Sequence, residues 1–369
     1  APRYKGRRRG ICPRTVQGVV ARRLTWGKKS ENKLCLGPEG LGSHEFYLNG
    51  FSSSLPMDIQ IEALETIPAL RHVQIFRPGY AIEYDFFDPT QLRHTLETRL
   101  VRNLFFAGQV NGTTGYEEAA GQGLVAGVNA ALNVLGRDDE PFVLGRDEAY
   151  IGVLIDDLVT KGVDEPYRMF TSRAEFRIML RQDDADMRLT PRGHAVGLAS
   201  DERLALMESK RTQRDALIDF ARSFSVKASL INEWLVARGT SPLSQGCKLS
   251  DLILRPQLSI AMLTEAITPL RRFIRENIEE TRRDEIIEAA EVQLKYAGYI
   301  ERERMMADRA RRLEDIVIRG KIDYQSVNAI STEARQKLVR IDPLTIGQAR
   351  RIPGISPADI NILLLLVGK

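Results

Sequence analysis

The chain has 369 residues and a net charge of +4. With 43% hydrophobic and 28% charged residues, it has the composition of a globular protein with room for two or three domains. No run of 18 apolar residues occurs and no apolar segment follows the basic N-terminus, so the sequence predicts neither a membrane span nor a secretory signal. Cys12, Cys35 and Cys247 have no metal-ligand spacing, so we expect no metal site, free thiols and a cytoplasmic location.

The first 36 residues are strongly basic. They hold 11 of the 53 Lys/Arg and only one of the 49 Asp/Glu, so the rest of the chain is net acidic. The overall pI of 8.9 therefore reflects this segment and does not by itself argue for nucleic-acid binding. Arg7–Arg9 and Arg22–Arg23 favour a solvated, poorly ordered arm, with an RNA-contacting arm as the alternative.

Residues 37–100 have the pattern of short strands and turns. Asn49-Gly50 predicts a turn, Leu55–Leu70 a short helix after a proline, and Val73–Phe76 a strand. The stretch Ile82–Asp88 mixes aromatic side chains with three carboxylates. Paired carboxylates suit acid–base chemistry, but carboxylates at a solvent edge are the more common arrangement.

A glycine-rich loop stands at the centre of the sequence. Leu104–Ala107 predicts a short strand, Gly108, Gly112 and Gly115 interrupt small polar residues, and a small-residue helix is expected over 117–135. Strand, loop and helix in this order bring backbone N–H groups and the positive end of a helix dipole to one point. Such a point suits an anion or the edge of an electron-rich ring. An ordinary strand-to-helix turn of an α/β protein is the alternative.

A second glycine pattern in this region is a decoy. Gly121–Ala126 fits G-x-G-x-x-G/A, but a dinucleotide fingerprint opens a helix directly after a strand, and these residues lie inside the expected helix. We interpret these glycines as packing residues, with Gly123 and Gly127 forming a smooth face of the helix.

The stretch 165–190 is rich in arginine. If it is helical, Arg173, Arg177 and Arg181 share one face. That face is either a surface of weak ion pairs with the aspartates that follow or a phosphate-contacting surface for RNA. Three aromatic residues would offer stacking surfaces for an unpaired base: Tyr167, Phe170 and Phe176.

From about residue 200 the pattern is helical, with apolar residues at three- and four-residue spacing. Ile352–Pro357 resembles the turn of a helix-hairpin-helix. Ser356 replaces the second glycine of such turns, which weakens the case for nucleic-acid binding there. The apolar stretch Ile360–Val367 is expected to pack into a small terminal bundle.

Long motifs carry a family resemblance. The segment 107–130, AGQVNGTTGYEEAAGQGLVAGVNA, resembles a signature of the MnmG (GidA) family of FAD-dependent enzymes that modify the wobble uridine of certain tRNAs. The resemblance continues in GPEGLGSHEFYLNGFSSSLPMDIQ at 37–60, RPGYAIEYDFFDP at 77–89, EPYRMFTSRAEFRIMLRQDDADMRLT at 165–190 and, more weakly, from QLKYAGYIERE at 293–303 to the C-terminus. It covers 37–369 and leaves out 5–36.

The resemblance implies an α/β plus all-α fold, in which the remainder of a FAD-binding Rossmann-type domain precedes C-terminal helical domains. The expected parts are an atypical segment at 1–36, part of the FAD-binding domain at 37–140, a tRNA-facing helical domain at 141–300 and a partner-docking bundle at 301–369. The family's N-terminal G-x-G-x-x-G unit, which holds the ADP half of FAD, does not occur here. The chain therefore resembles the C-terminal part of a longer protein.

The resemblance also implies an activity. The parent would use FAD, NADH and methylenetetrahydrofolate to add a carboxymethylaminomethyl-type group at C5 of the wobble uridine of tRNA. It would be a homodimer that binds an MnmE-type GTPase through its C-terminal helices, away from any membrane. One alternative is a folate-dependent tRNA uridine methyltransferase of the TrmFO type, which lacks a long C-terminal helical region. The other is a non-catalytic module that binds tRNA and a partner. The chain alone is expected to bind FAD poorly and to be inactive.

The site residues implied by the resemblance fall into three groups. Gln109 matches a FAD-contacting position of the family, and the other cofactor-binding candidates are Gly108, Asn111, Gly112, Thr113, Gly115 and Glu118. The tRNA-binding candidates are Arg168, Arg173, Arg177 and Arg181. No catalytic residue is assigned, and the candidates are Cys12, Tyr80, Glu83 and Asp85.

The candidate Cys12 comes from the N-terminal segment. Ala1–Tyr4 resembles the start of the family's Cys-Pro motif, so an insertion would place that motif's cysteine at Cys12. The rest of the motif is missing after Cys12, which favours out-of-frame or foreign sequence at 5–36. The other three catalytic candidates lie in RPGYAIEYDFFDP, which in the family is near the flavin.

Overall fold

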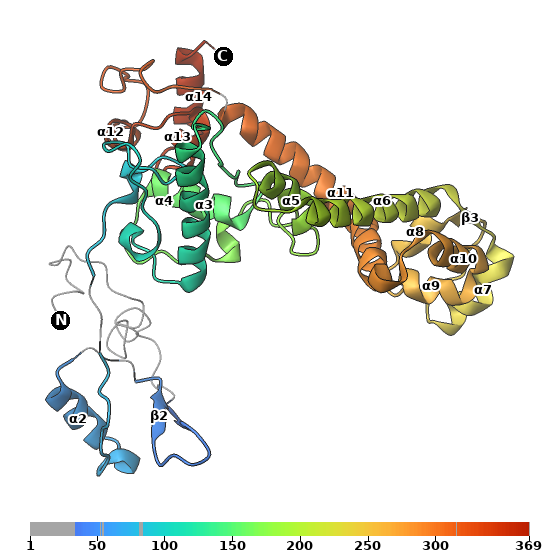
Figure 1. Ribbon diagram of the computed structural model, residues 1–369, viewed down its shortest axis with the longest axis horizontal. Helices are drawn as coiled ribbons and strands as arrows, with labels where there is room; N and C mark the ends of the chain where they lie inside the picture. Colours follow the sequence, from blue (N-terminus) through green and yellow to red (C-terminus); the bar gives the residue numbers. More distant parts are fainter. Residues whose placement is uncertain (1–33, 52, 54, 81–83, 315, 369) are drawn as a thin grey trace. The chain divides into compact units, whose positions relative to one another are not determined.

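A computed structural model describes residues 34–51, 53, 55–80, 84–314 and 316–368 (Figure 1). These residues form two compact units. Unit 1 contains the described residues up to 130 together with 157–169, and unit 2 contains 131–156 and the residues from 170 onward. The basic N-terminal segment, with Cys12, lies outside the described residues, and so does Glu83.

Unit 1 is built from short elements. They are β1 (Cys35–Pro38), β2 (Phe46–Asn49), α2 (Met57–Glu65), the 3-10 turns η3 (Pro68–Leu70), η4 (Pro89–Gln91) and η5 (Gly108–Asn111), the start of α3 (Tyr116–Val134) and the end of α4 (Tyr150–Lys161). β1 and β2 form an antiparallel hairpin that pairs Cys35 with Asn49. The turn predicted at Asn49-Gly50 is confirmed, with Gly50 at φ +96°. The helix predicted within Leu55–Leu70 is confirmed as α2.

The strands predicted at Leu104–Ala107 and Val73–Phe76 are wrong. The first forms only an isolated antiparallel bridge between Glu97 and Phe105, and the second has no strand geometry. A strand is stable beside a neighbour that takes up its N–H and C=O groups. Val73–Phe76 has no such neighbour among the described residues. Leu104–Phe106 has one only at residues 96–98, through the bonds from Thr98 N to Leu104 O and from Phe106 N to Leu96 O. The helix predicted over 117–135 is confirmed as α3, because its signal lies in local residue preferences and needs no partner strand.

Unit 2 is helical. After the end of α3 and the start of α4 come η6 (Thr171–Arg173), α5 (Ala185–Ala195), α6 (Asp201–Ser223), α7 (Ala228–Ala237), α8 (Leu249–Ile253), α9 (Ile260–Ala266), α10 (Thr268–Asn277), η7 (Glu280–Arg282), α11 (Arg283–Glu314), α12 (Thr332–Ile341), α13 (Ile346–Arg351) and α14 (Pro357–Leu366). Two short strands, β3 (Ser225–Val226) and β4 (Cys247–Lys248), pair antiparallel between α6 and α8. None of the described helices is both long enough and apolar enough to cross a membrane.

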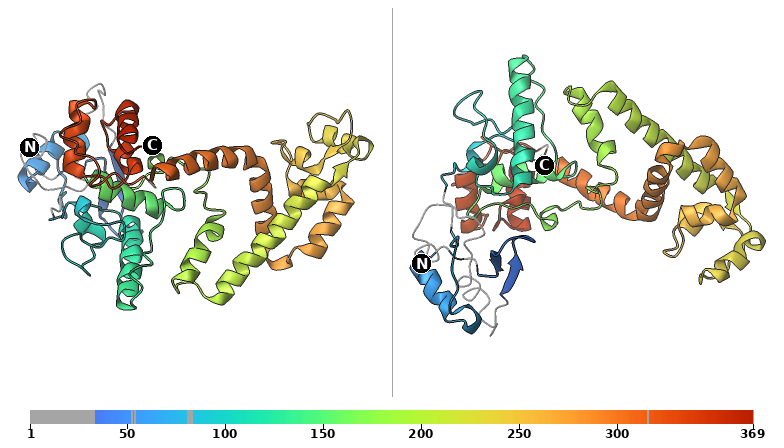
Figure 2. Two further views of the ribbon diagram at one scale, coloured as in Figure 1. Left: turned by 90° about the horizontal axis from the view of Figure 1, so that it is seen from above. Right: turned by 60° about the horizontal axis from the view of Figure 1, so that its bottom comes forward.

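Two apolar cores stabilise unit 2. In the first, α6 and the first part of α11 lie side by side with α7 to α10, and fully buried side chains such as Leu252 and Leu263 fill the space between them (Figures 1 and 2). The second lies in the C-terminal bundle, where Ile346 and Leu363 are fully buried. The predicted hairpin at residues 352–357 is confirmed between α13 and α14. Ser356, the replacement for a glycine, accepts a hydrogen bond from Asp359 N and so caps α14.

Candidate functional site

The glycine loop, residues 108–115, lies in unit 1 between the bridge at Phe105 and the start of α3. Its first four residues form the 3-10 turn η5. Gly108 has φ +82° and Gly112 has φ +76°, values in the left-handed region that residues with a side chain adopt only under strain. The path of the loop therefore depends on glycine at these two positions.

Gln122, on the second turn of α3, bonds to the loop at three points and is fully buried. Its Oε1 accepts hydrogen bonds from Gly108 N at 3.1 Å and from Asn111 Nδ2 at 2.8 Å. Its Nε2 donates to Thr113 Oγ1 at 3.0 Å, and that hydroxyl donates to Gly108 O at 2.8 Å. The helix thus provides partners for three groups on the buried side of the loop, whereas Asn111 Oδ1 is buried without a hydrogen bond in the described structure.

This role of Gln122 was not predicted from the sequence, where only the glycines beside it were interpreted as packing residues. A signal was present. Glu118, Gln122 and Asn129 are polar residues at spacings of four and seven, one and two helical turns, along one side of α3, and all three are buried. Buried polar side chains at helical spacing indicate hydrogen-bonding partners in the protein and not apolar packing.

A second element contacts the loop from another direction. The 167–169 segment, Tyr167–Met169, follows α4 in the chain and runs parallel to the loop at Thr113. Tyr167 N donates to Gly112 O at 2.9 Å. Met169 N donates to Glu118 Oε1 at 2.7 Å. The loop and the head of α3 are therefore hydrogen-bonded to a segment more than 50 residues away in the chain.

The N-terminal end of α3 holds the chain's own carboxylate. Glu118, 3% exposed, lies in the first turn, where the helix dipole favours negative charge. Arg168 Nε is 3.7 Å from its Oε1. A Cβ on Gly115 would lie 1.5 Å from Glu118 Oε2, so only glycine leaves room for this carboxylate. The positive end of α3, where the sequence suggested an external anion, is thus already paired.

The exposed side of the loop carries different groups. The Gln109 side chain is exposed and makes no hydrogen bond to the described residues, and Tyr116, which opens α3, is 93% exposed. The carboxylate-rich stretch lies beside them, because Phe87 N donates to Val110 O at 2.8 Å. Asp85, two residues before Phe87, is exposed. The structure therefore brings two predicted site residues, Gln109 and Asp85, onto neighbouring segments.

The structure shows no contact between the loop and the remaining catalytic candidate that it describes, Tyr80. Tyr80 is 74% exposed and follows Gly79, whose N and O both bond to the side chain of the buried Gln60 at 2.8 Å. This contact ties the Arg-Pro-Gly turn to α2. Cys12 and Glu83 lie outside the described residues.

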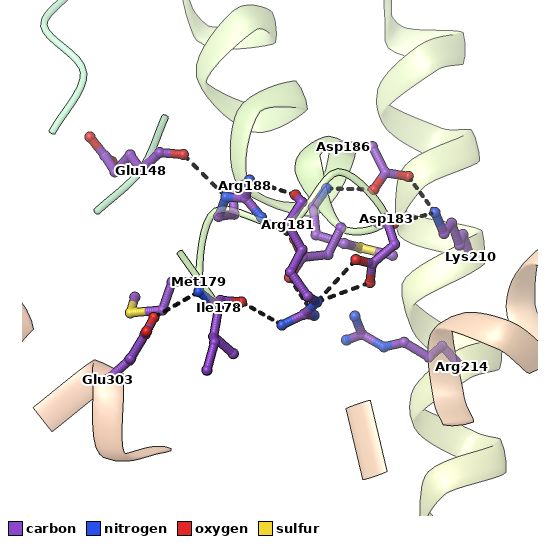
Figure 3. Close-up of polar contacts among 12 residues, drawn as sticks. Glu148, Ile178, Met179, Arg181, Asp183, Asp186, Arg188, Lys210, Arg214 and Glu303 are labelled. Carbon is purple, nitrogen blue, oxygen red and sulfur yellow. Dashed lines mark hydrogen bonds and ion pairs between the residues drawn. The ribbon is translucent and has the colours of Figure 1, made fainter. Parts of the chain in front are cut away.

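The arginine-rich segment in unit 2 does not form the helix on which the prediction of a shared arginine face depended. Thr171–Arg173 forms a 3-10 turn, and no α-helix spans 173–181. Glu303 of α11 accepts hydrogen bonds from Ile178 N and Met179 N, both at 3.0 Å (Figure 3). Residues 177–180 form a turn in which Met179 N also bonds to Phe176 O, and Glu303 holds this turn from a distant helix. Because the backbone is not helical, the predicted arginine face is wrong.

The arginines of this segment differ in what they contact. Arg181 is paired within the protein: its Nε is 3.0 Å from Asp183 Oδ1 (Figure 3). Its Nη2 is 3.0 Å from Asp184 Oδ2. Arg188 also pairs with Asp184. Burial raises the pKa of Asp184, although both arginines act to lower it. Arg177 is exposed and has no side-chain partner among the described residues, so it is the predicted tRNA-binding arginine most accessible to a phosphate.

The predicted stacking surface is mostly buried. Tyr167 and Phe176 are 5% and 8% exposed, so the prediction that they stack on a base is wrong. Phe170 is 43% exposed and keeps part of its ring accessible. Arg173 is exposed as well, whereas Arg168 pairs with Glu118 in unit 1.

Three parts of the chain match family models of known proteins. Residues 1–138 match the family model of glucose inhibited division protein A, and this match includes the N-terminal segment that the resemblance left out. Residues 201–304 match the C-terminal helical domain of the tRNA modifying enzyme MnmG/GidA, and residues 306–369 match its C-terminal helical bundle. The chain belongs to the MnmG/GidA family.

Individual relatives agree with this assignment. The chain is 61% identical over 369 residues to the tRNA uridine 5-carboxymethylaminomethyl modification enzyme MnmG of Parabacteroides distasonis, and 59% identical to that of Bacteroides fragilis. Each alignment covers 100% of this chain and 59% of the relative, so the chain spans about three fifths of their length. The form II crystal structure of Aquifex aeolicus GidA matches with a TM-score of 0.73 and 42% identity, over 95% of this chain and 54% of that chain.

Membership of the MnmG/GidA family confirms the fold class. Part of the family's FAD-binding domain is followed by its C-terminal helical domains. The matches at 201–304 and 306–369 also decide against the TrmFO-type alternative, which lacks this helical region.

The residues of the glycine loop fit the flavin of this FAD-binding family. Gly108 and Gly112 are buried and take the left-handed backbone that turns the loop, and the loop is already held in shape by Gln122. The exposed Gln109 amide offers one acceptor and two donors, which complements the alternating C=O and N–H groups at the edge of a flavin ring.

Proposed function

We propose that this chain is part of a tRNA-modifying flavoenzyme, which adds a carboxymethylaminomethyl-type group at C5 of the wobble uridine in the cytoplasm. The observation that carries the proposal is the preformed glycine loop, which is hydrogen-bonded on one side to Gln122 and on another to the 167–169 segment. Its relatives named as tRNA uridine 5-carboxymethylaminomethyl modification enzymes supply the reaction. FAD, when bound, supplies redox chemistry, with NADH as reductant and methylenetetrahydrofolate as one-carbon donor.

The chain's own residues have separate tasks in this proposal. Gln109 bonds to the edge of the flavin ring, and Gly108 and Gly112 take the left-handed backbone that turns the loop. Asp85 is the acid–base candidate, because it is exposed on the segment that bonds to the loop through Phe87. These roles agree with the position of each side chain relative to the loop.

The tRNA contact belongs to unit 2. Arg177 is exposed and its side chain has no partner among the residues that the structure describes, and Arg173 and Phe170 are exposed near it in sequence. Guanidinium groups bind phosphate oxygens, and a partly exposed ring can stack on an unpaired base. Arg168 and Arg181 are not proposed as primary phosphate contacts, because each pairs with a carboxylate of the protein.

The C-terminal bundle is the proposed docking site for the MnmE-type GTPase, with the parent protein as a homodimer. Leu365 and Leu366 at the end of α14 are 77% and 52% exposed, and Val339 on α12 is 44% exposed. Apolar side chains that a small bundle leaves in water are suited to burial against a partner.

The test uses a bacterium without its own MnmG. A hybrid protein that completes this chain with the part of the Parabacteroides relative that it lacks is expressed there, and the wobble nucleosides of total tRNA are measured by mass spectrometry. The hybrid is expected to restore the modified uridine, and the chain alone is not. Gln109→Ala in the hybrid should lower the modified fraction and the flavin content together. Gln182→Ala is the matched control, because Gln182 is exposed and its side chain has no hydrogen bond in the described structure.

The opposite results are equally clear. A folded, flavin-loaded hybrid that leaves the wobble uridine unmodified would overturn the proposed reaction. Stoichiometric flavin on the purified chain alone, read from its visible absorption after desalting, would contradict the expectation that the chain binds FAD poorly without the rest of the parent.

A further inference from the structure

We propose that the 167–169 segment is a positioning element for the glycine loop, and that Tyr167 and Glu118 are its positioning residues. The inference rests on the proposed function, since it names the groups that orient the flavin-facing loop. It gives a second role to a stretch for which the sequence suggested ion pairs at the surface or contact with RNA.

Two hydrogen bonds from backbone N–H groups join the 167–169 segment to the loop region. Tyr167 N bonds to Gly112 O, in the middle of the loop, and Met169 N bonds to the carboxylate of Glu118, just beyond its end. Gly112 and Glu118 are both buried. If the segment moved away, both acceptors would lose these donors without gaining water, so the bonded arrangement is favoured.

The segment itself is anchored to α4. The Tyr167 hydroxyl donates to Asp157 Oδ2 at 2.9 Å, and Lys161 Nζ is 2.6 Å from the other carboxylate oxygen of Asp157. Asp157 is 1% exposed and belongs to the last turns of α4. The hydroxyl thus fixes the 167–169 segment to a helix, and the backbone of the segment fixes the loop.

The contacts around the loop are divided between α3 and the 167–169 segment. Gln122 contacts Gly108, Asn111 and Thr113 from α3, and none of these bonds reaches Gly112 O. That carbonyl bonds to Tyr167 instead. The helix therefore holds the loop at Gly108, Asn111 and Thr113, and the 167–169 segment adds the contact at Gly112 that Gln122 does not make. A change at Tyr167 should act first on the backbone around Gly112 while Gln122 still holds Gly108.

The experiment compares three variants with a matched control. Tyr167→Phe removes only the hydroxyl that bonds to Asp157. Glu118→Ala removes the acceptor of Met169 N, whereas Glu118→Gln keeps an oxygen at that place. Tyr299→Phe is the control. It also removes a tyrosine hydroxyl, but from a side chain on α11 that is 56% exposed. Amide hydrogen exchange over residues 108–115 is measured in the 369-residue chain, and FAD affinity and absorption are measured in the hybrid protein.

In Tyr167→Phe and Glu118→Ala, the loop amides are expected to exchange roughly fivefold faster or more, the factor that corresponds to one lost hydrogen bond. Glu118→Gln and Tyr299→Phe should stay near the parent. In the hybrid, the first two variants should raise the FAD dissociation constant at least about threefold and shift the flavin absorption band, since the ring edge loses its fixed partners. A residue that only supports the fold would change the melting of the protein without this spectral shift.

Two results would overturn the inference while leaving the proposed function intact. One is unchanged loop exchange in both Tyr167→Phe and Glu118→Ala. The other is faster exchange with unchanged FAD affinity and spectrum in the hybrid. If the unsubstituted hybrid bound no FAD, the proposed function itself would fail and this inference with it, and that outcome is separate because it is seen before any substitution is made.

Discussion

Lys210 in α6 is a buried cation, and its removal should destabilise the helical module formed by α6 to α11. The residue is 3% exposed, with Nζ 2.9 Å from Asp186 Oδ2 and 2.7 Å from Glu285 Oε1. Figure 3 shows the contact with Asp186, which joins α5 to α6. The substitution Lys210→Met keeps most of the apolar stem and removes the charge, so it isolates the two ion pairs.

The magnitude follows from opposing effects. Two hydrogen bonds to charged groups contribute about 1.5–3 kcal/mol each, but burying the ammonium costs several kcal/mol, a cost that methionine avoids. The side chains of Asp186 and Glu285 are 31% and 47% exposed, so water solvates what the lysine leaves behind, and Arg282 still pairs with Glu285. We expect a net loss of about 2 kcal/mol in the free energy of unfolding.

The pH dependence of this effect has a defined window. Burial lowers the pKa of Lys210, but its bonds to Glu285 and Asp186 raise the pKa more, so the net pKa lies above 10.5. The hydrogen bond from Arg282, with a smaller one from Lys210, holds the pKa of Glu285 below 4.5. A raised lysine pKa stabilises below 10.5, and a lowered glutamate pKa stabilises above 4.5. The difference between parent and Lys210→Met should therefore be largest between these values and shrink outside them.

The assay reads one of the two tryptophans of the chain. With Trp26 replaced by phenylalanine, the fluorescence of Trp234 in α7 reports the unfolding of the module in urea. Lys210→Met should lower the midpoint by about 1 M or more, given the slopes usual for small domains. Lys227→Met, an exposed lysine without a side-chain partner among the described residues, is the control and should change the stability by less than about 0.5 kcal/mol. An equally small change in Lys210→Met would refute the reasoning.

Three further predictions concern the bundle and the loop. Burial raises the pKa of Asp359, but hydrogen bonds from Ser356 and Ser331 lower it more, so its stabilisation is present above pH 3.8 and lost as the pH falls below it; Asp359→Asn should cost about 2 kcal/mol at pH 7 and flatten the melting profile below pH 4. Burial raises the pKa of Tyr324 to about 12, and its hydroxyl has no partner in the described structure. Tyr324→Phe should therefore raise the free energy of opening of the bundle by up to about 1 kcal/mol and slow its hydrogen exchange, and faster exchange would contradict this. Gly115→Ala should displace the Glu118 carboxylate and weaken FAD binding to the hybrid about tenfold or more, and unchanged affinity would show that the carboxylate moves without consequence.

Local chemistry made the glycine loop and α3 predictable from sequence. Glycines at 108 and 112 indicate a backbone that other residues resist, and the run of small residues after 116 favours a helix. The partners of the loop were not predictable in the same way. Gln122 is 14 residues from Gly108, and Tyr167 is far beyond that, so no pattern of three or four residues connects them to the loop. Only the fold reveals that two polar residues of unremarkable appearance complete the site.

The prediction of a shared arginine face was wrong for a related reason. Spacing predicts which side chains share a face only if the backbone is helical. Residues 177–180 instead form a turn, and Glu303, 125 residues away from Ile178, accepts hydrogen bonds from two of its N–H groups. The charges of Arg177 and Arg181 look alike in sequence. In the structure one is exposed and the other is bonded to two aspartates, so their capacity to bind phosphate differs.

Glu118 and Glu303 solve the same physical problem for one stretch of irregular backbone. Residues 167–181 have little regular structure, and backbone N–H groups that are partly or fully buried need acceptors. In unit 1 the carboxylate of Glu118 accepts from Met169 N, and in unit 2 the carboxylate of Glu303 accepts from Ile178 N and Met179 N. Each glutamate belongs to a helix, so the path of the stretch is specified by side chains of α3 and α11 and not by its own propensities. Because the stretch runs in a few residues from the loop contact to Arg177, it provides a direct covalent link between the proposed flavin site and the proposed tRNA contact.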